Sequence, residues 1–376
     1  MDKDNELLEY SVVYTDRALN HMSKRFQTVM CEISTILKGV YSAAGVAIVP
    51  GSGTFAMEAV ARQIAGDKRC MVLRNGWFSY RWTQILEQCG ISSSVLVCKA
   101  YATESSPHPH YAPMPIDMLC EKITSYRPEV FFAPHVETSA GMILPDNYLR
   151  RIGDAVRAVG GVFVLDCIAS GAMWVDMEEC MVDFLITAPQ KGWTGTPCAG
   201  VVLMNQRAQK MVTSSQSSSF ACDLKKWFEI MQRYEAGGHA YHATMPTDGL
   251  QTFRDVMKEA QEHGFDYLKK QQKQLGEAIR SLCAQHWKSL VPQEFAAPSV
   301  VVCYTDSFEE HKGIVFAKHG IQIAAGVPLR CDEKEAFQTF RIGLFGLDKL
   351  IHLQRTIENF DAVLRKLKPT NNESTA

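Results

Sequence analysis

One stretch organises the rest of the chain, and it reads Ile48-Val49-Pro50-Gly51-Ser52-Gly53-Thr54-Phe55-Ala56-Met57-Glu58-Ala59. An apolar run passes through a Gly-Ser-Gly loop into a helical pattern. A strand, a glycine loop and a helix in this order direct backbone N–H groups and the positive end of a helix dipole at one point. The sequence therefore predicts an anion site in this loop, most naturally for a phosphate group.

The same letters match Gly-x-Gly-x-x-Ala, the fingerprint of dinucleotide-binding domains. That fingerprint requires an acidic residue about 20 positions further on, at the end of the next strand. This chain has Arg74, Asn75 and Gly76 there, and no lysine follows the second glycine as in a Walker loop. The match is therefore interpreted as accidental, which leaves a different phosphate site or a turn that only reverses the chain.

On both sides of this loop, short apolar runs alternate with helix-length segments. The runs cover residues 45–49, 70–73, 94–98, 129–133, 162–165, 184–187 and 201–204. Helical patterns cover residues 15–39, 54–65, 78–89, 115–125 and 146–158. This alternation predicts an α/β fold with a mostly parallel sheet between helices.

The second half of the chain has a different pattern. A Ser-rich loop at 213–219 and long helical material at 243–286 precede a smaller α+β unit. Its expected strands lie near 299–304, 321–324 and 339–342, and its helices lie at 308–319 and 349–367. We expect a large domain over 15–285, a small C-terminal domain over 286–370, and a frayed tail over 371–376.

Composition excludes several classes of protein. The 376 residues are 46% hydrophobic and 21% charged with a formal net charge of -2, which describes a globular chain without the electrostatic footprint of a nucleic-acid or membrane binder. The charged N-terminus resembles no signal peptide, and the twelve cysteines form no Cys-x-x-Cys pair. We expect a cytoplasmic protein with reduced cysteines, and the isolated pair His108 and His110 does not indicate a metal site.

Two strand-like runs end on residues with catalytic chemistry. Residues 162–166 are an apolar run that ends on Asp166, and residues 184–192 deliver Lys191 after a second such run. Parallel α/β sheets bind ligands at the carboxyl ends of their strands. A lysine, an acid and a phosphate loop are what pyridoxal phosphate needs, for the Schiff base, the pyridine nitrogen and the phosphate respectively.

With these features the chain resembles the class V aminotransferases of the fold-type I pyridoxal phosphate enzymes, over about residues 15–367. The resemblance is to the alanine-glyoxylate, serine-pyruvate and 2-aminoethylphosphonate-pyruvate branch. It rests on six motifs in series: residues 51–54 (Gly-Ser-Gly-Thr), 75–78 (Asn-Gly-Trp-Phe), 137–141 (Glu-Thr-Ser-Ala-Gly), Asp166, Gln190-Lys191 and 341–346 (Arg-Ile-Gly-Leu-Phe-Gly).

The resemblance implies roles for individual residues. Lys191 would form the Schiff base and move the proton, and Asp166 would face the pyridinium nitrogen. The remaining cofactor ligands would be Ser52, Gly53, Thr54 and Gln190 at the phosphate, Thr138 beside the ring oxygen or phosphate, and Phe78 and Ile168 on the two ring faces.

The resemblance also implies a shared site. Tyr241 and Thr244 match residues that reach into the neighbouring subunit's phosphate site, so a homodimer is expected. Arg341 matches the arginine that binds a substrate carboxylate, because a guanidinium offers a two-pronged donor. Three departures fall on the substrate side: residues 10–17 replace a Gly-Pro-rich opening, Cys167 follows Asp166, and residues 325–331 match the pattern of no one member of the family.

We therefore predict a transaminase that passes an amino group from an α-amino acid or an aminophosphonate-like amine to pyruvate or glyoxylate, with ping-pong kinetics. One alternative is a lyase on the same fold, such as a cysteine desulfurase with Cys331 as nucleophile. That group places histidines where this chain has Gln190 and Phe78. The other alternative is a non-catalytic protein that binds the cofactor.

Overall fold

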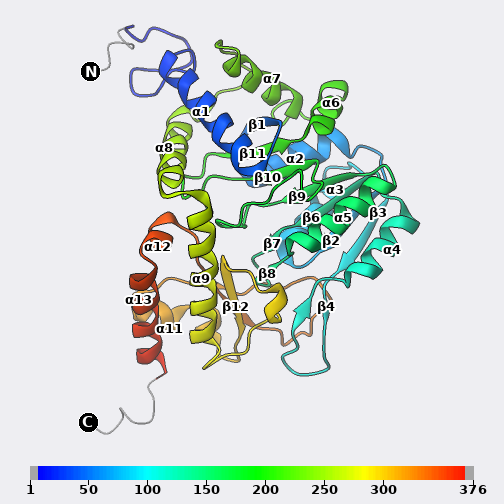
Figure 1. Ribbon diagram of the computed structural model, residues 1–376, viewed down its shortest axis with the longest axis vertical. Coiled ribbons are helices and arrows are strands. Elements are labelled where there is room, and N and C mark those ends of the chain that lie inside the picture. Colours follow the sequence, from blue (N-terminus) through cyan, green and yellow to red (C-terminus); the bar gives the residue numbers. More distant parts are fainter. Residues whose placement is uncertain (1–6, 369–376) are drawn as a thin grey trace.

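A seven-stranded sheet forms the centre of the computed structural model, which describes residues 7–368 (Figure 1). Its strands follow the order β1-β11-β10-β9-β6-β2-β3. Their bounds are β1 Gly45–Pro50, β2 Cys70–Arg74, β3 Val95–Lys99, β6 Val130–Pro134, β9 Val162–Asp166, β10 Phe184–Thr187 and β11 Ala199–Met204. Each strand predicted for this sheet is present within two residues of its expected bounds, which confirms the predicted α/β class.

Only β11 runs against its neighbours. It pairs antiparallel with both β1 and β10, whereas the pairs β10–β9, β9–β6, β6–β2 and β2–β3 are parallel. The carboxyl ends of β1, β2, β6, β9 and β10 therefore meet at one edge of the sheet. This edge is where loops can carry a site.

Helices cover both faces of the sheet. The chain moves in one direction across the sheet through α2 (Gly53–Ile64) and α3 (Trp77–Gln88), and in the other direction through α4 (Ile116–Tyr126) and α5 (Asp146–Ala158). Right-handed crossovers place the first pair on one face and the second pair on the opposite face. Contacts between α2 and α3, and between α4 and α5, agree with this arrangement.

The first helix begins later than predicted. Helix α1 spans Lys24–Tyr41 and not 15–39, because the Ser23 side chain accepts a hydrogen bond from the N–H of Phe26 and fixes the helix start there. Residues 15–23 form turns instead. Three further helices, α6 (Gln206–Ser214), α7 (Leu224–Glu235) and α8 (Thr247–His263), complete this part of the chain.

The long helical material breaks at one glycine. Gly264 has a φ of 90°, so α8 ends there and α9 (Phe265–Cys283) starts in a new direction. Helix α9 runs from the large sheet to the small one (Figure 1).

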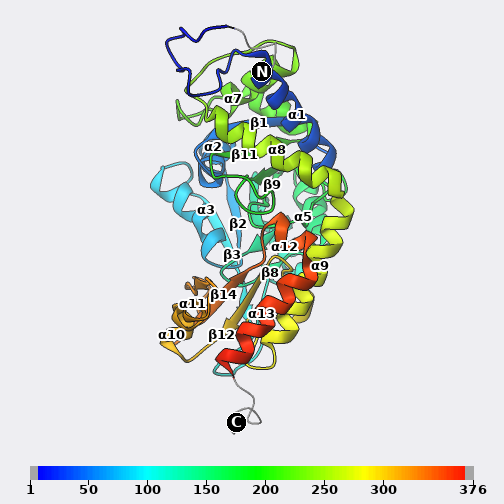
Figure 2. The ribbon, with the colours of Figure 1, turned by 90° about the vertical axis from the view of Figure 1, so that its left-hand side faces the viewer.

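The C-terminal part is a three-stranded antiparallel sheet with the order β12-β14-β13. Its elements are β12 Val300–Tyr304, α10 Phe308–His311, α11 Ile314–Lys318, β13 Ala324–Ala325, β14 Thr339–Gly343, α12 Leu347–Ile351 and α13 Leu353–Leu367. Helices α10 and α11 lie on one side of the sheet and α9 and α13 on the other (Figure 2). The predicted helix 308–319 is wrong as one helix, because Gly313 adopts a φ of 72° between α10 and α11.

Short elements connect these layers. The pair β4 (Tyr101–Ala102) and β5 (Tyr111–Ala112) and the pair β7 (Val136–Glu137) and β8 (Met142–Ile143) are small hairpins, and η2 (Gln293–Phe295) is a 3-10 turn. The division at residue 285 stays a prediction, and residues 371–376 of the predicted tail lie outside the described residues.

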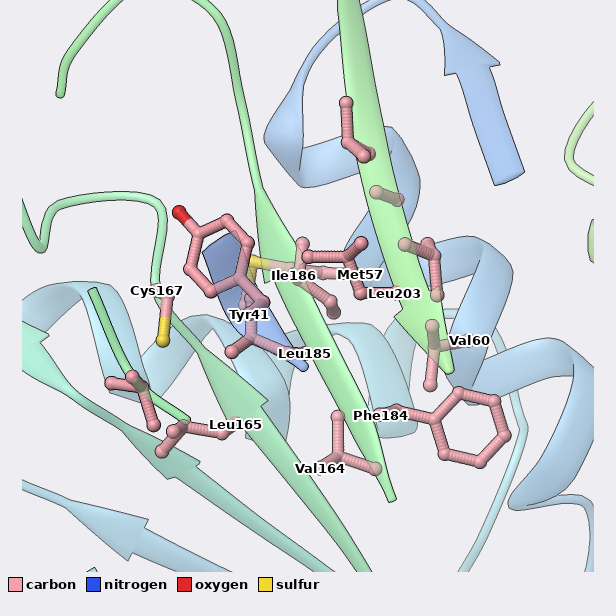
Figure 3. Close-up of a cluster of buried hydrophobic side chains, with 14 of the residues drawn as sticks. Tyr41, Met57, Val60, Val164, Leu165, Cys167, Phe184, Leu185, Ile186 and Leu203 are labelled. Carbon is pink, nitrogen blue, oxygen red and sulfur yellow. The ribbon is translucent and has the colours of Figure 1, made fainter. Parts of the chain in front are cut away.

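The core lies between the sheet and its helices. Side chains from β9, β10 and β11 pack with Met57 and Val60 of α2 and with Tyr41 at the end of α1 (Figure 3). Cys167 belongs to this cluster with 2% of its surface exposed, so it fills the core and does not line the substrate side. All twelve cysteines are free.

Within residues 7–368, no helix is both long and apolar enough to cross a membrane. The same part of the chain has no group of three or more His, Cys, Asp or Glu side chains placed to hold a metal ion.

Candidate active site

The predicted site residues follow strands that end at the same edge of the sheet. Asp166 is the last residue of β9, and Lys191 lies four residues after β10, its parallel neighbour. The Gly-Ser-Gly loop follows β1, whose carboxyl end pairs with the start of β11. Three separate loops are thus brought together by sheet topology alone.

Lys191 sits in an aromatic and electrostatically mixed environment. Its Nζ lies 5.7 Å from the ring centre of Phe78 and 5.6 Å from that of Phe345. Burial lowers the pKa of Lys191, opposed by the negative charge of Asp166 and assisted by Arg341. A lowered pKa increases the fraction of neutral amine, the form that attacks a carbonyl and accepts a proton.

Asp166 is a buried acid with one hydrogen bond within the chain. Its side chain is buried, and Oδ1 accepts from the backbone N–H of Ile168 at 2.9 Å. Burial raises the pKa of Asp166 to about 6, against the hydrogen bond from Ile168 and the positive charge of Lys191. A buried carboxylate with a single hydrogen bond would be stabilised by a cationic ring N–H, which supplies both a hydrogen-bond donor and an opposite charge.

The glycine loop leaves space and free polar groups. A Cβ on Gly53 would lie 2.5 Å from Cδ1 of Ile168, so any larger residue here would require the Ile168 side chain to move. Ser52 is the N-cap residue of α2, yet its hydroxyl makes no capping hydrogen bond. The side-chain oxygen of Gln190 is buried without a partner in the described chain. These groups fit a phosphate held at the start of α2.

A second helix start is fixed by one buried carboxylate. Oε2 of Glu137 accepts from the N–H and hydroxyl of Ser79 at 2.8 and 2.7 Å, and Oε1 accepts from the N–H of Phe78 at 3.2 Å and the hydroxyl of Ser139 at 2.7 Å. A Cβ on Gly76 would lie 2.0 Å from the Ser139 hydroxyl. Glu137 thus anchors the start of α3 and with it the position of Phe78.

Arg341 reaches the site from the small sheet. It lies on β14, and its Nε donates to the carbonyl of Ala325 at 2.8 Å. Its Cζ lies 5.6 Å from the ring centre of Phe78, the ring that Lys191 also approaches. The hydrogen bond through Nε leaves the terminal guanidinium nitrogens available for a carboxylate.

The remaining predicted residues divide into two groups. Thr138 is buried beside Glu137 at the sheet edge. Tyr241 and Thr244 are exposed and bond to each other, with 3.1 Å between their hydroxyl oxygens, and the Tyr241 ring lies 5.6 Å from that of His21. They make no hydrogen bond to the other predicted site residues in the described chain.

Arg81 also lies at the site, although no sequence motif indicated a role for it. Its Nη1 donates to the Thr54 hydroxyl at 2.9 Å, and its Cζ lies 5.5 Å from the Phe78 ring centre. This places a positive charge at the phosphate loop. The spacing of three residues from Phe78 on a helix was the signal that could have identified it.

The match to a known family decides the class. A model of the family "Aminotransferase class-V" matches residues 1–345. The chain belongs to the class-V aminotransferase family. As a member, it is a pyridoxal phosphate-dependent transaminase, and the predicted family, cofactor and enzyme class are confirmed.

Class-V relatives extend over most of the chain. Alanine–glyoxylate aminotransferase 1 of Saccharomyces cerevisiae is 24% identical over 331 residues, which cover 82% of each chain. A 2-aminoethylphosphonate–pyruvate transaminase of Syntrophobacter fumaroxidans is 29% identical over 220 residues, 58% of this chain and 55% of that one. The solved alanine–glyoxylate aminotransferase of Nostoc sp. superposes with a TM-score of 0.76 at 20% identity, covering 92% of this chain and 89% of that chain, which confirms the predicted fold.

Proposed function

We propose that this class-V aminotransferase transfers an amino group from a small amine to pyruvate or glyoxylate. The observation that carries the proposal is the convergence of Lys191 and Arg341 on the ring of Phe78, at 5.7 and 5.6 Å. One side chain supplies a reactive amine and the other supplies a carboxylate-binding group. A keto acid or amino acid held by Arg341 would bring its reacting carbon toward Lys191.

Each remaining residue then has a defined task. Bound pyridoxal phosphate supplies a carbonyl that condenses with amines and a ring that withdraws electrons. Ser52, Gly53, Thr54 and Gln190 would hold its phosphate, with charge from Arg81. Asp166 would keep the ring nitrogen protonated, and Phe78 and Ile168 would enclose the ring.

Proton transfer falls to the lysine. Lys191 Nζ would accept the proton that leaves the amino carbon of the donor, because its lowered pKa favours the neutral amine. The aromatic rings of Phe78 and Phe345, with centres 5.7 and 5.6 Å from Nζ, limit the water around this amine. Thr138 would bind beside the cofactor ring or its phosphate.

Two classes of donor fit Arg341. An α-amino acid would present its carboxylate to Arg341 in the same way as the keto acid, and the yeast and Nostoc relatives carry alanine–glyoxylate names. A terminal amine with a distal phosphonate would use Arg341 only at its far end, and the Syntrophobacter relative is named for such a substrate. Both classes of donor would undergo the same amino-group transfer, and their measured activities distinguish them.

The experiment is a kinetic matrix on the cofactor-loaded enzyme. Alanine, serine and 2-aminoethylphosphonate are paired with pyruvate or glyoxylate, apart from alanine with pyruvate, which regenerates its own substrates, and the new amino acid is quantified. The proposal predicts parallel double-reciprocal lines for at least one pair, since the first product leaves before the keto acid binds. Intersecting lines for every active pair, or no amino-group transfer with any pair, would reject it.

The lyase alternative lacks support from Cys331. This thiol is 3% exposed, its Sγ contacts the carbonyl oxygen of Arg74 at 3.3 Å, and burial raises its pKa to about 12. A desulfurase nucleophile is an accessible thiolate, which these surroundings disfavour. The non-catalytic alternative is excluded by the family assignment.

We further propose a homodimer. Tyr241 and Thr244 are exposed, and within the described chain their hydroxyl groups make no hydrogen bond to the other predicted site residues. Exposed hydroxyls that bond, among residues 7–368, only to each other fit residues that complete the phosphate site of a second copy.

A further inference from the structure

A second polar cavity lies outside the catalytic site. It has a volume of about 380 Å³ and is bordered by α9, the start of α5, the end of β8 and the turn η2. None of the residues proposed above for the cofactor or the substrate lines it. Its residues therefore need an explanation of their own.

One face of α9 brings three cations to this cavity. Lys269, Lys273 and Arg280 line it, and spacings of four and seven residues place them along one side of a helix. The carboxylates of Asp146 and Glu277 line it as well, so the formal balance is one positive charge. His135, which also borders the cavity, stays neutral because burial lowers its pKa to about 3.

Arg280 is the group that indicates a ligand. It is 9% exposed, and its Nη2 donates to the carbonyl of Ala297 at 2.7 Å. Its Nη1 is buried and has no hydrogen-bond partner in the described chain. A buried charged donor without an acceptor is costly, and an anion in the adjoining cavity would satisfy it.

We propose that this cavity binds a small molecule through a carboxylate or phosphate group, which Arg280 would hold with help from Lys269 and Lys273. Lys269 uses one N–H for the carbonyl of Trp174 at 3.2 Å, which leaves two for a ligand. Lys273 is exposed and would contact the ligand at the solvent side of the cavity. This site is separate from the reaction proposed above and does not depend on it.

The cavity also has a built-in reporter. Trp174 lines it and lies 4.6 Å, ring centre to ring centre, from the buried Trp193, two residues after Lys191. Gly171 also packs closely on Gly192: a Cβ on Gly192 would lie 2.3 Å from the carbonyl oxygen of Gly171. An anion beside Trp174 should change its fluorescence.

The test is a fluorescence titration of the cofactor-loaded enzyme, with succinate in one arm and inorganic phosphate in the other, at ionic strength held constant with sodium chloride. The substitution Arg341→Ala is made in all proteins, so that anions at the substrate site do not contribute. We expect a saturable change with at least one anion, and the responding arm identifies the group that binds.

Substitutions then locate the signal. Arg280→Met should weaken binding about tenfold or more, because a hydrogen bond to a charged group is lost. Lys273→Ala, an exposed change with little effect on folding, should weaken it severalfold, and the matched exposed control Lys270→Ala should not. A change that fails to saturate, or one that is equal in the Lys273→Ala and Lys270→Ala proteins, would overturn the proposal even if Arg280→Met misfolds. Transaminase activity plays no part in this readout.

Discussion

Burial acts on Lys191 and Asp166 in opposite directions. Removal from water disfavours the charged form of each group, so it lowers the pKa of the lysine and raises that of the acid to about 6. The lysine gains reactivity from this effect. Burial of the ionised acid has a free-energy cost, and a cationic ring nitrogen beside it would reduce that cost.

The cost of this acid can be measured in the cofactor-free protein. Because the folded pKa of Asp166 lies above the ordinary value of 3.8, its contribution to folding is lost as pH rises from about 4 to 6. We predict that Asp166→Asn raises the free energy of unfolding above pH 6 by up to about 3 kcal/mol, since two pKa units correspond to that amount. The difference should vanish near pH 4.

Denaturant unfolding at several pH values provides the comparison. Equal stability of the two proteins at pH 8 would contradict a buried, uncompensated charge. The same substitution should lower transaminase activity strongly, because an amide cannot keep a ring nitrogen protonated.

Arg341 is predicted to act on both half-reactions. Arg341→Ala should raise the KM for the keto acid about tenfold or more, as loss of a charge-assisted hydrogen bond does. Arg341→Lys keeps the charge without the two-pronged geometry and should recover only part of the loss. An unchanged keto acid dependence in the alanine variant would remove Arg341 from the substrate site.

The start of helix α3 depends on Glu137. Its side chain is fully buried. It accepts hydrogen bonds from the N–H of Phe78, and from both the N–H and the hydroxyl of Ser79 and of Ser139. We predict that Glu137→Gln lowers the free energy of unfolding by about 2 kcal/mol or more and weakens cofactor binding, because an amide group cannot accept at both atoms.

Thermal melts and cofactor titration test this, with Glu121→Gln on the exposed side of α4 as the control. If Glu137→Gln melts like the control and binds the cofactor equally well, Glu137 does not hold the helix start.

Strands were predictable from the sequence because those of a parallel sheet are buried on both faces and appear as continuous apolar runs, as in residues 162–165. The ends of helices were less predictable. Ser23 starts α1 well inside a pattern that is amphipathic from residue 15, and Gly264 and Gly313 split helical patterns that have no periodic break.

The site residues also divide into those that a local sequence pattern indicates and those that depend on packing. Asp166 and Lys191 could be predicted because one is the last residue of an apolar strand and the other lies in the loop after the next strand. The contact between Arg81 and Thr54 joins two helices and depends on how they pack. The anion cavity beside α9 also depends on packing, since Arg280 and Asp146 are far apart in sequence.

The homodimer proposed above can be tested by mixing subunits. If Thr244 of one copy completes the Lys191 site of the other, mixing two inactive variants should restore activity. Lys191→Ala and a double variant, Tyr241→Phe with Thr244→Val, are each purified, unfolded together and refolded as a mixture. We predict recovery of up to about one quarter of wild-type activity, because half of the dimers are mixed and each has one intact site.

Sites contained within one chain would give only the sum of the two separate activities. A mass measurement in solution on the same samples reports the oligomeric state.

The role of Lys191 in transamination is tested by the visible absorption spectrum of the purified, cofactor-loaded protein, recorded before and after addition of single amines without a keto acid. We predict an absorption band that disappears with at least one donor and returns when pyruvate or glyoxylate is added. The Lys191→Ala variant should show neither change at a comparable rate. A band that no amine removes, or one that Lys191→Ala loses and regains as quickly as the wild type, would contradict the assignment of Lys191 as the centre of a transaminase.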